Sequence, residues 1–321
     1  MLVSPAAPAP STPRTIAFRL KPVRVDETFP ALGTDVRLIA SGAGARAAVA
    51  AARAEILDYH ARLSRFIPSS ELSRLNADER TVVPASALLR SAVDAALWAA
   101  RNSDGLVDPC LLDALRAAGY ERSFDRRAAS PPPPPPSRPG RAAGADPAQR
   151  WRALRIDDDA GTIARPAGLR LDLGGSGKGH VADLVARHFA RSGGWVIDCG
   201  GDVRVGGSRL VEIAHPLRER PAACLTISDG AVATSSIVGR AWRHSDGRRA
   251  HHLLDPATGE PAWSGLLSAT AVARTTLHAE TLAKVALLRG AAGAREVLAP
   301  RGGVIVHADG DVETITAGTA R

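Results

Sequence analysis

The sequence predicts an α+β fold in which mixed, largely antiparallel sheets pack against helices. Short alternating segments typical of strands are spread along the chain between segments with helical periodicity. The two kinds do not alternate regularly, as they would in a doubly wound parallel sheet. Hydrophobic residues make up 45% of the 321 residues, so the chain can bury a sizeable core. We expect a disordered tail over residues 1–15 and a single domain over residues 16–321.

The first half of the chain is expected to form two strands followed by three helices. Alternating polar and apolar residues indicate the strands, and apolar residues spaced three and four apart indicate the helices. An Asn-Ser-Asp-Gly turn signal ends the second helix. The expected strands are Phe18–Pro30 and Leu32–Ile39, and the expected helices are Ala45–Ser64, Ser86–Asn102 and Asp108–Ala118.

A proline-rich segment follows, at about residues 125–150. It contains six consecutive prolines, which lack amide donors and favour an extended, solvated backbone. We interpret this segment as an insertion loop within the domain that forms no packed element. A linker between two domains is the alternative that composition alone leaves open.

The second half is expected to contain mainly short strands and two helices. A glycine-rich turn precedes the first of these helices, and a loop is expected at Arg240–Ala250. The expected strands are Ala153–Ile156, Thr162–Ala164, Leu169–Leu173, Trp195–Asp198, Val211–Ala214, Ala223–Ile227, Ala231–Thr234, His252–Leu254, Leu267–Ala273 and Gly303–His307, and the expected helices are His180–Arg191 and His278–Arg289.

The formal net charge of +8 favours anionic partners. The basic residues are nevertheless scattered, and neither a zinc-finger spacing nor an aromatic-basic motif accompanies them, so we do not expect a nucleic-acid partner. Cys110, Cys199 and Cys224 lack metal-ligand spacing and suit a reducing compartment. No stretch of 18 apolar residues or secretory leader is evident, so we expect no membrane span and a cytoplasmic location.

The glycine-rich segment Leu173–His180 is the first candidate for binding chemistry. Four glycines within six positions permit left-handed backbone angles and close approach to a ligand. A turn of this kind before a helix can point several backbone N–H groups at a phosphate, and Lys178 adds a positive charge. The segment matches neither a Walker loop nor a dinucleotide fingerprint. A purely structural turn and a phosphate site therefore both remain open.

Three further segments contain candidate functional residues. His252 precedes the turn Asp255–Gly259 and is either structural or a general base, since imidazole titrates near neutral pH. Glu280 and Lys284 lie four residues apart on one helix face. They form either a surface ion pair or a ligand group contributed by the first helical turn. Phe66 is either a core residue or a surface on which an aromatic ring stacks.

Together and in order, these segments resemble the ApbE-type flavin transferases (FAD:protein FMN transferases). The similarity runs from about Thr28 to Gly303 and is interrupted by the proline-rich segment. It includes a counterpart of the family's Leu-Gly-Gly-Ile-Ala-Lys-Gly-Tyr loop and of its His-Ile-Ile-Asp-Pro-x-Thr-Gly motif. The matching segments are Ala31–Thr34, Ser64–Phe66, Ser70–Asn76, Asp104–Pro109, Leu173–Asp183, Gly200–Asp202 and His252–Gly259.

The resemblance implies an ApbE-like fold and an enzyme that cleaves FAD and transfers FMN, as a phosphoester, to a Ser or Thr hydroxyl of a target protein. The expected partners are thus FAD and an acceptor protein with an exposed Ser or Thr, with Mg²⁺ as the expected metal. Charge in such a transition state lies on phosphoryl oxygens, so catalysis depends mainly on positioning and electrostatics.

The resemblance also implies roles for individual residues. His252 would act as a base or acid near the acceptor hydroxyl, Asp255 would orient the turn, and Lys178 would stabilise the diphosphate; these three are the predicted catalytic residues. The predicted cofactor-binding residues are Leu32, Phe66, Leu106, Val107, Asp108, Gly174, Gly175, Lys178, His180, Asp183 and Leu254.

The metal ligands are where the sequence departs from the family. The family holds its metal with a backbone carbonyl of the Ile-Ala-Lys stretch and with Asp and Thr of an Ala-Asp-Ala-Leu-Ser-Thr helix, and the matching positions are Gly177, Glu280 and Lys284. An ammonium group cannot ligate Mg²⁺. Lys284 therefore either leans away from a weaker metal site or itself neutralises the diphosphate. Two alternatives to transfer stay open: a relative that only binds FAD, and a hydrolase that releases FMN and AMP.

Overall fold

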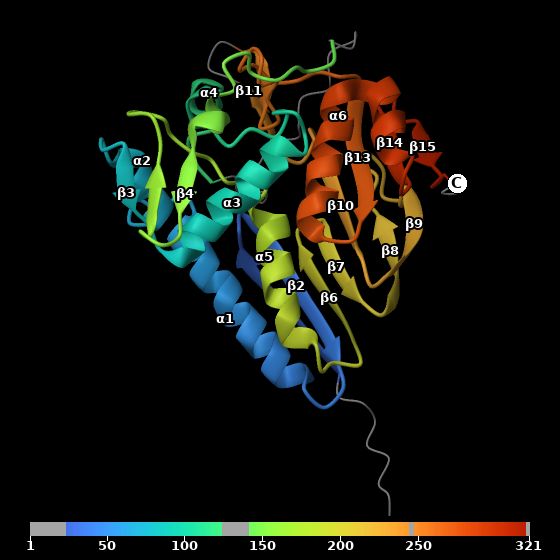
Figure 1. Ribbon diagram of the computed structural model, residues 1–321. Coiled ribbons are helices and arrows are strands. Elements are labelled where there is room, and N and C mark those ends of the chain that lie inside the picture. Colours follow the sequence, from blue (N-terminus) through green and yellow to red (C-terminus); the bar gives the residue numbers. More distant parts are fainter. Residues whose placement is uncertain (1–23, 124–140, 244–246, 319–321) are drawn as a thin grey trace, which may run out of the picture.

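The computed structural model describes residues 24–123, 141–243 and 247–318. The predicted tail at residues 1–15 and much of the predicted insertion lie outside these ranges. Within them, helices pack on largely antiparallel sheets, which confirms the predicted α+β class (Figure 1). The largest sheet has eight strands in the order β1-β2-β6-β7-β10-β13-β14-β15, and every neighbouring pair is antiparallel. These strands are Arg24–Ala31, Thr34–Ser41, Gly194–Cys199, Asp202–Gly206, Ala231–Ser236, Leu266–Ala273, Gly303–His307 and Val312–Ile315.

Three smaller sheets flank the large one. One has the order β3-β5-β4, and the other two are the pairs β8-β9 and β11-β12. Their strands are β3 (Val82–Pro84), β4 (Arg155–Asp157), β5 (Thr162–Ala164), β8 (Ser208–Ile213), β9 (Ala223–Ser228), β11 (Ala241–Arg243) and β12 (Arg249–His251).

Helices α1, α5 and α6 cover one face of the large sheet (Figure 1). The main core forms between this face and the buried sides of α1 and α3, and includes Leu38, Ile56 and Ile197. Among the described residues, no helix is long and apolar enough to cross a membrane. The helices are α1 (Ala45–Leu63), α2 (Glu71–Ala77), α3 (Ala87–Arg101), α4 (Leu112–Ala117), α5 (Gly177–Val185) and α6 (Thr276–Leu298), with short 3₁₀ turns η1 (Arg150–Ala153) and η2 (Ala186–Phe189).

The hairpin between β1 and β2 turns at Leu32 and Gly33. Both residues have positive φ, 58° and 67°, as a two-residue type I′ turn requires. Glycine adopts this conformation without strain, whereas leucine does not. The break predicted at Gly33 is thus a tight hairpin, and Leu32 is a strained residue at its tip.

Two predicted strands are not strands in the structure. Residues 169–173 have no strand partner, because the side-chain amide of Asn76 donates to the carbonyl of Leu171 (2.8 Å) and accepts from its N–H (2.7 Å). A single side chain thus replaces the neighbouring strand. At His252–Leu254 there is only one isolated bridge, between Leu254 and Pro261. The predicted loop Arg240–Ala250 instead contains β11 and most of β12.

Helix α6 begins two residues before its predicted start. Thr275 caps it by accepting from the N–H of His278 (3.3 Å). Glu280 therefore lies beyond the first helical turn, from which it was expected to contribute a ligand group. Gly290 has a φ of 70° and interrupts the helix near the predicted end at Arg289.

Candidate active site

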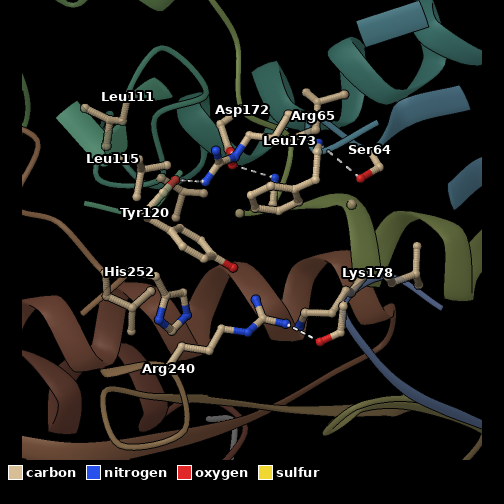
Figure 2. Close-up of a pocket in the computed structure, with 18 of the residues that line it drawn as sticks. Ser64, Arg65, Leu111, Leu115, Tyr120, Asp172, Leu173, Lys178, Arg240 and His252 are labelled. Atoms are coloured by element: carbon tan, nitrogen blue, oxygen red, sulfur yellow. Dashed lines mark hydrogen bonds and ion pairs between the residues drawn. The ribbon is translucent and has the colours of Figure 1, made fainter. Parts of the chain in front are cut away.

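One cavity brings together residues from distant parts of the chain (Figure 2). It lies beside the glycine-rich segment that leads into α5 and encloses about 1260 Å³ of space, its open mouth included. Twelve residues of the predicted site line this cavity. They are Leu32, Phe66, Leu106, Val107, Asp108, Gly174, Gly175, Gly177, Lys178, His252, Leu254 and Lys284.

Two predicted cofactor-binding residues, His180 and Asp183, instead hold the helices together behind the cavity. His180 lies between the hydroxyls of Tyr59 (3.2 Å) and Ser91 (3.1 Å), and burial lowers its pKa to about 4. The Asp183 carboxylate accepts from the N–H groups of Thr276 (2.8 Å) and Leu277 (2.9 Å) at the start of α6. These residues join α5 to α1, α3 and α6.

Asp255, predicted as catalytic, is buried within its turn and does not line the cavity. Its Oδ1 accepts from the N–H groups of Gly144 (2.9 Å) and Ala257 (3.1 Å). The N–H of Ala257 also donates to the carbonyl of Gly144 (3.0 Å). Gly144 thus packs against the turn, while the described residues 141–149 form no helix or strand.

The glycines of Leu173–His180 serve close packing and have no left-handed backbone angles. Gly174, Gly175, Gly177 and Gly179 all fall outside the positive-φ region, which corrects the expected reason for their presence. A Cβ on Gly179 would lie 2.7 Å from the backbone of Leu277, and one on Gly177 would lie 3.3 Å from the Tyr59 hydroxyl. The N–H of Gly179 donates to Glu280 (2.8 Å) and is not directed at the cavity.

Two carboxylates and two ammonium groups form a buried cluster beneath the cavity: Asp202, Lys178, Glu280 and Lys284. Lys178 donates to Asp202 and lies 3.3 Å from Glu280 Oε1. Lys284 Nζ lies 2.8 Å from the same oxygen. Only the two lysines line the cavity. The carboxylates thus hold two cations at the cavity wall.

The pKa values in this cluster follow from burial and from the paired charges. Burial alone would raise the pKa of Glu280, but the ammonium groups of Lys284 and Lys178 hold it below its usual range. Burial would lower the pKa of Lys178, but Asp202 and Glu280 raise it. Burial raises the pKa of Asp202, which Lys178 opposes. Glu280 and Lys178 are therefore charged at neutral pH.

The Mg²⁺ implied by the family resemblance does not fit these residues. Both oxygens of Glu280 are engaged, Oε1 by two ammonium groups and Oε2 by the N–H of Gly179. Within the described ranges, no group of three or more His, Cys, Asp or Glu residues could hold a metal ion. Two unit charges 4 Å apart near a protein surface interact by about 4 kcal/mol, so a divalent cation beside two ammonium groups would be strongly repelled.

The opposite side of the cavity is aromatic, and local sequence patterns did not identify most of it. Tyr120 stacks on Trp242 at 5.4 Å between ring centroids and meets the edge of Phe66 at 5.5 Å. Figure 2 shows the Tyr120 ring projecting between the upper wall and His252. Both tyrosines of the chain, Tyr59 and Tyr120, line the cavity. Aromatic residues make up only 4% of the chain, so the rarity of tyrosine was the one sequence feature that could have pointed to these residues.

Arg65, Asp172 and Arg240 were also missed. The buried guanidinium of Arg65 is paired with Asp172, donates to the carbonyl of Tyr120 (2.9 Å) and stacks on the Phe66 ring at 4.1 Å. Arg240 reaches across the cavity floor to the carbonyl of Gly33 (3.2 Å), in the direction of Lys178 (Figure 2). The cavity therefore has a cationic floor and an aromatic roof fixed by a buried ion pair.

His252 and Asp108 each present an unpartnered polar atom. His252 Nδ1 is buried without a hydrogen-bond partner, and burial together with Arg240, His251 and Lys284 holds its pKa well below 6.5. Its imidazole is therefore neutral at pH 7. Asp108 Oδ1 accepts from the N–H of Cys110 (2.7 Å), whereas Oδ2 is buried without a partner. Burial raises the pKa of this carboxyl group.

Comparison with solved structures finds the same fold in ApbE proteins. The ApbE protein of Thermotoga maritima superposes with a TM-score of 0.75 at 22% identity, covering 91% of this chain and 97% of that one. The flavin transferase ApbE of Vibrio cholerae superposes with a TM-score of 0.70 at 19% identity, covering 93% and 98%. At these identities the likeness establishes the fold.

Curated relatives match over a shorter stretch. The FAD:protein FMN transferase of Treponema pallidum is 32% identical over 142 residues, which are 39% of this chain and 39% of that protein. The enzyme of the same name from Klebsiella pneumoniae is 32% identical over 117 residues, 35% and 37% of the two chains. The match thus spans less than two fifths of the length of these relatives.

A family model described as the ApbE family matches residues 32–307. This range begins at the strained hairpin tip, ends in β14, and contains every residue of the predicted site. The family resemblance seen in the sequence is thereby confirmed: the chain belongs to the ApbE family.

Proposed function

We propose that this protein is an FAD:protein FMN transferase, which transfers FMN from FAD to a Ser or Thr hydroxyl of an acceptor protein. The observation that carries the proposal is the two-sided cavity. Lys178, Lys284 and Arg240 supply positive charge on one side, and aromatic and aliphatic side chains form the other. FAD has the complementary character, since its anionic diphosphate links two ring systems. Family membership and the relatives' names support the same activity.

The transfer breaks the phosphoanhydride bond of FAD and forms a phosphoester bond to the acceptor. The acceptor hydroxyl oxygen attacks the phosphorus on the FMN side of the diphosphate, a new P–O bond forms, and the bond to the bridging oxygen breaks. AMP leaves with that oxygen. Lys178, Lys284 and Arg240 stabilise negative charge that shifts onto phosphoryl oxygens during this step. These side chains are already held in place, so little reorganisation is needed.

His252 is the proposed general base. Its neutral imidazole, with Nδ1 unpartnered, can take the proton of the acceptor hydroxyl as the oxygen attacks. Asp255 acts as a positioning residue, because it fixes the turn that follows His252 through two backbone N–H groups.

Asp108 and the aromatic side are proposed to hold the ring systems and sugars. The unpartnered Oδ2 of Asp108 can accept a hydrogen bond from a hydroxyl or amine of FAD. Phe66 and Tyr120 offer surfaces for ring stacking, and Leu106 and Val107 line the same side.

The test is attachment of flavin to an acceptor protein. The purified protein is incubated with FAD and an acceptor that carries Thr in an exposed loop, and flavin fluorescence is read on a denaturing gel. Fluorescence that survives denaturation and moves with the acceptor supports transfer. Free FMN and AMP without attachment would indicate a hydrolase, and intact bound FAD would indicate a binding protein. Either of these outcomes would contradict the proposal.

A variant pair tests the role of His252. His252→Gln should lower the rate of attachment by about 10²–10⁴-fold, the usual contribution of a general base, while FAD still binds. His188→Gln is the matched control, because His188 pairs with Glu55 outside the cavity. Equal loss of attachment in both variants would argue against a specific role for His252.

We also propose that the chain forms one domain with the proline-rich segment as an insertion. The eight-stranded sheet draws β1 and β2 from before that segment and its other six strands from after it, which favours an insertion over a linker. The absence of a nucleic-acid partner and the cytoplasmic location stay predictions from the sequence.

A further inference from the structure

Glu280 has the surroundings of an ion-pair partner and lacks those of a metal ligand. Its side chain is 1% exposed, and its Oε1 lies 2.8 Å from Lys284 Nζ and 3.3 Å from Lys178 Nζ. Its Oε2 accepts from the N–H of Gly179 at 2.8 Å. The carboxylate thus forms ion pairs with both lysines and accepts a hydrogen bond from the backbone of α5. A metal could reach it only by displacing one of these groups.

Lys284 is held between this carboxylate and the cavity. It follows Glu280 by four residues on α6, an arrangement in which a carboxylate and an ammonium group meet on one helix face. Its side chain is 12% exposed and lines the cavity. In the described part of the chain, its only ion pair and hydrogen bond go to Glu280. An ammonium group has three N–H donors, so two remain for a ligand.

Lys178 is held in a similar way from the other side. It is paired with Asp202 and approaches Glu280, and it also lines the cavity. Both ammonium groups thus approach the same oxygen, Glu280 Oε1. Mg²⁺ takes oxygen ligands in a strict octahedral arrangement, and both oxygens of Glu280 are already engaged by the two ammonium groups and by the N–H of Gly179.

We propose that the ammonium groups of Lys178 and Lys284 take the place of a divalent metal beside the FAD diphosphate, so that this protein binds FAD and transfers FMN without Mg²⁺. The inference rests on the proposed function, because it assumes that FAD occupies the cavity. Its new element is that Lys284, where the family pattern has a metal-binding Thr, is a built-in cation for the phosphates.

Calorimetric titration with FAD tests the inference directly. The wild-type protein is titrated in EDTA and again in excess Mg²⁺. We expect the dissociation constants to agree within about twofold. Electron paramagnetic resonance with Mn²⁺ as the probe should detect no ion bound at stoichiometry. The transfer assay repeated in EDTA should give an unchanged rate.

Two variants of α6 sharpen the test. Lys284→Met keeps the apolar length of the side chain and removes its charge, and should weaken FAD binding in EDTA by about tenfold. Arg289→Met removes a cation from the same helix outside the cavity, beside Asp104, and should leave binding unchanged. Lys284→Arg preserves the charge and should retain most of the affinity, which separates loss of charge from loss of fold.

A double variant should convert the site to metal dependence. Glu280→Asp combined with Lys284→Thr introduces the family pattern. The double variant should bind FAD weakly in EDTA, regain FAD affinity when Mg²⁺ is added, and bind one Mn²⁺. The inference is overturned if the wild-type protein requires Mg²⁺ to bind FAD, if it binds Mn²⁺ at stoichiometry, or if the Lys284→Met variant binds FAD as tightly as the wild type does. The first two results leave the proposed function intact. FAD that fails to bind with or without Mg²⁺ contradicts the proposed function as well.

Discussion

Gly179 of α5 and Leu277 of α6 are in backbone contact: a Cβ on Gly179 would lie 2.7 Å from both N and Cα of Leu277. The contact also brings the N–H of Gly179 to Glu280. Any side chain at position 179 would separate the helices that carry Lys178 and Lys284. The glycine is thus required by packing between two helices that are about one hundred residues apart in the chain.

Gly179→Ala is therefore expected to lower the free energy of unfolding by about 2–3 kcal/mol, because the atoms in the way are backbone atoms that cannot rotate aside. Urea denaturation gives the measurement. Gly44→Ala is the control, since a Cβ there would meet nothing within 4 Å, and at this N-cap of α1 it should change stability by less than about 1 kcal/mol. Equal effects in the two variants would contradict this account.

Arg65→Met is expected to cost about 2–3 kcal/mol of stability, because it leaves the partly buried Asp172 carboxylate without its cation. Adding Asp172→Asn should recover part of the loss, since the amide oxygen can still accept from the N–H of Gly174. Arg295→Met breaks the exposed pair with Glu313 and should cost less than about 1 kcal/mol. If the double variant is no more stable than Arg65→Met, the ion pair is not the cause.

Acid should destabilise the protein through His180. Burial lowers its folded pKa from 6.5 to about 4, so below pH 6.5 the unfolded chain binds a proton that the folded chain does not. The contribution of His180 to the free energy of unfolding is fully present above pH 6.5 and is lost as the pH falls toward 4. At pH 5 the loss should be about 2 kcal/mol. His180→Gln lacks this term, so its stability deficit relative to wild type should shrink from pH 8 to pH 5. A constant deficit would show that His180 does not titrate in this range.

Asp108→Asn should weaken FAD binding without lowering the free energy of unfolding. The variant removes a buried charge whose Oδ2 has no partner, so the free energy of unfolding should rise or stay the same. An amide N–H in place of Oδ2 cannot accept a hydrogen bond from FAD, and the affinity for FAD should fall about tenfold. Denaturation and calorimetry measure the two quantities. A parallel fall in both would mean that Asp108 is structural.

Local patterns in the sequence predicted much of the fold. Alternation located β2 and the hairpin break at Gly33, and periodicity located α1 and α3 within one or two residues. The false strand at Leu169–Leu173 shows the limit of such patterns. Its backbone is satisfied by Asn76, a side chain that lies 95 residues away and leaves no local signal.

Site residues that belong to a local sequence motif were predicted, whereas residues that only tertiary contacts bring to the site were missed. The glycine-rich segment and the His252 turn were identifiable along the chain, and the cavity contains residues of both. Tyr120 and Trp242 meet only because β11 lies against the end of α4, where the Trp242 indole donates to the carbonyl of Ala118 (2.9 Å). Asp183 was assigned to the ligand because nothing local shows that it caps α6.

Ser123, which precedes segment 124–140, lines the cavity, whereas Arg141, which follows that segment, lies 3.6 Å from Asp255. This makes the protein a convenient scaffold for engineering. A Thr-bearing acceptor sequence inserted directly after Ser123 would be tethered beside the cavity, at an effective concentration of about 1 mM for a short flexible linker. Under the proposed transferase function, such a chimera would label itself with flavin, without a separate target protein. Its fluorescence would then report on variants of the cavity within living cells.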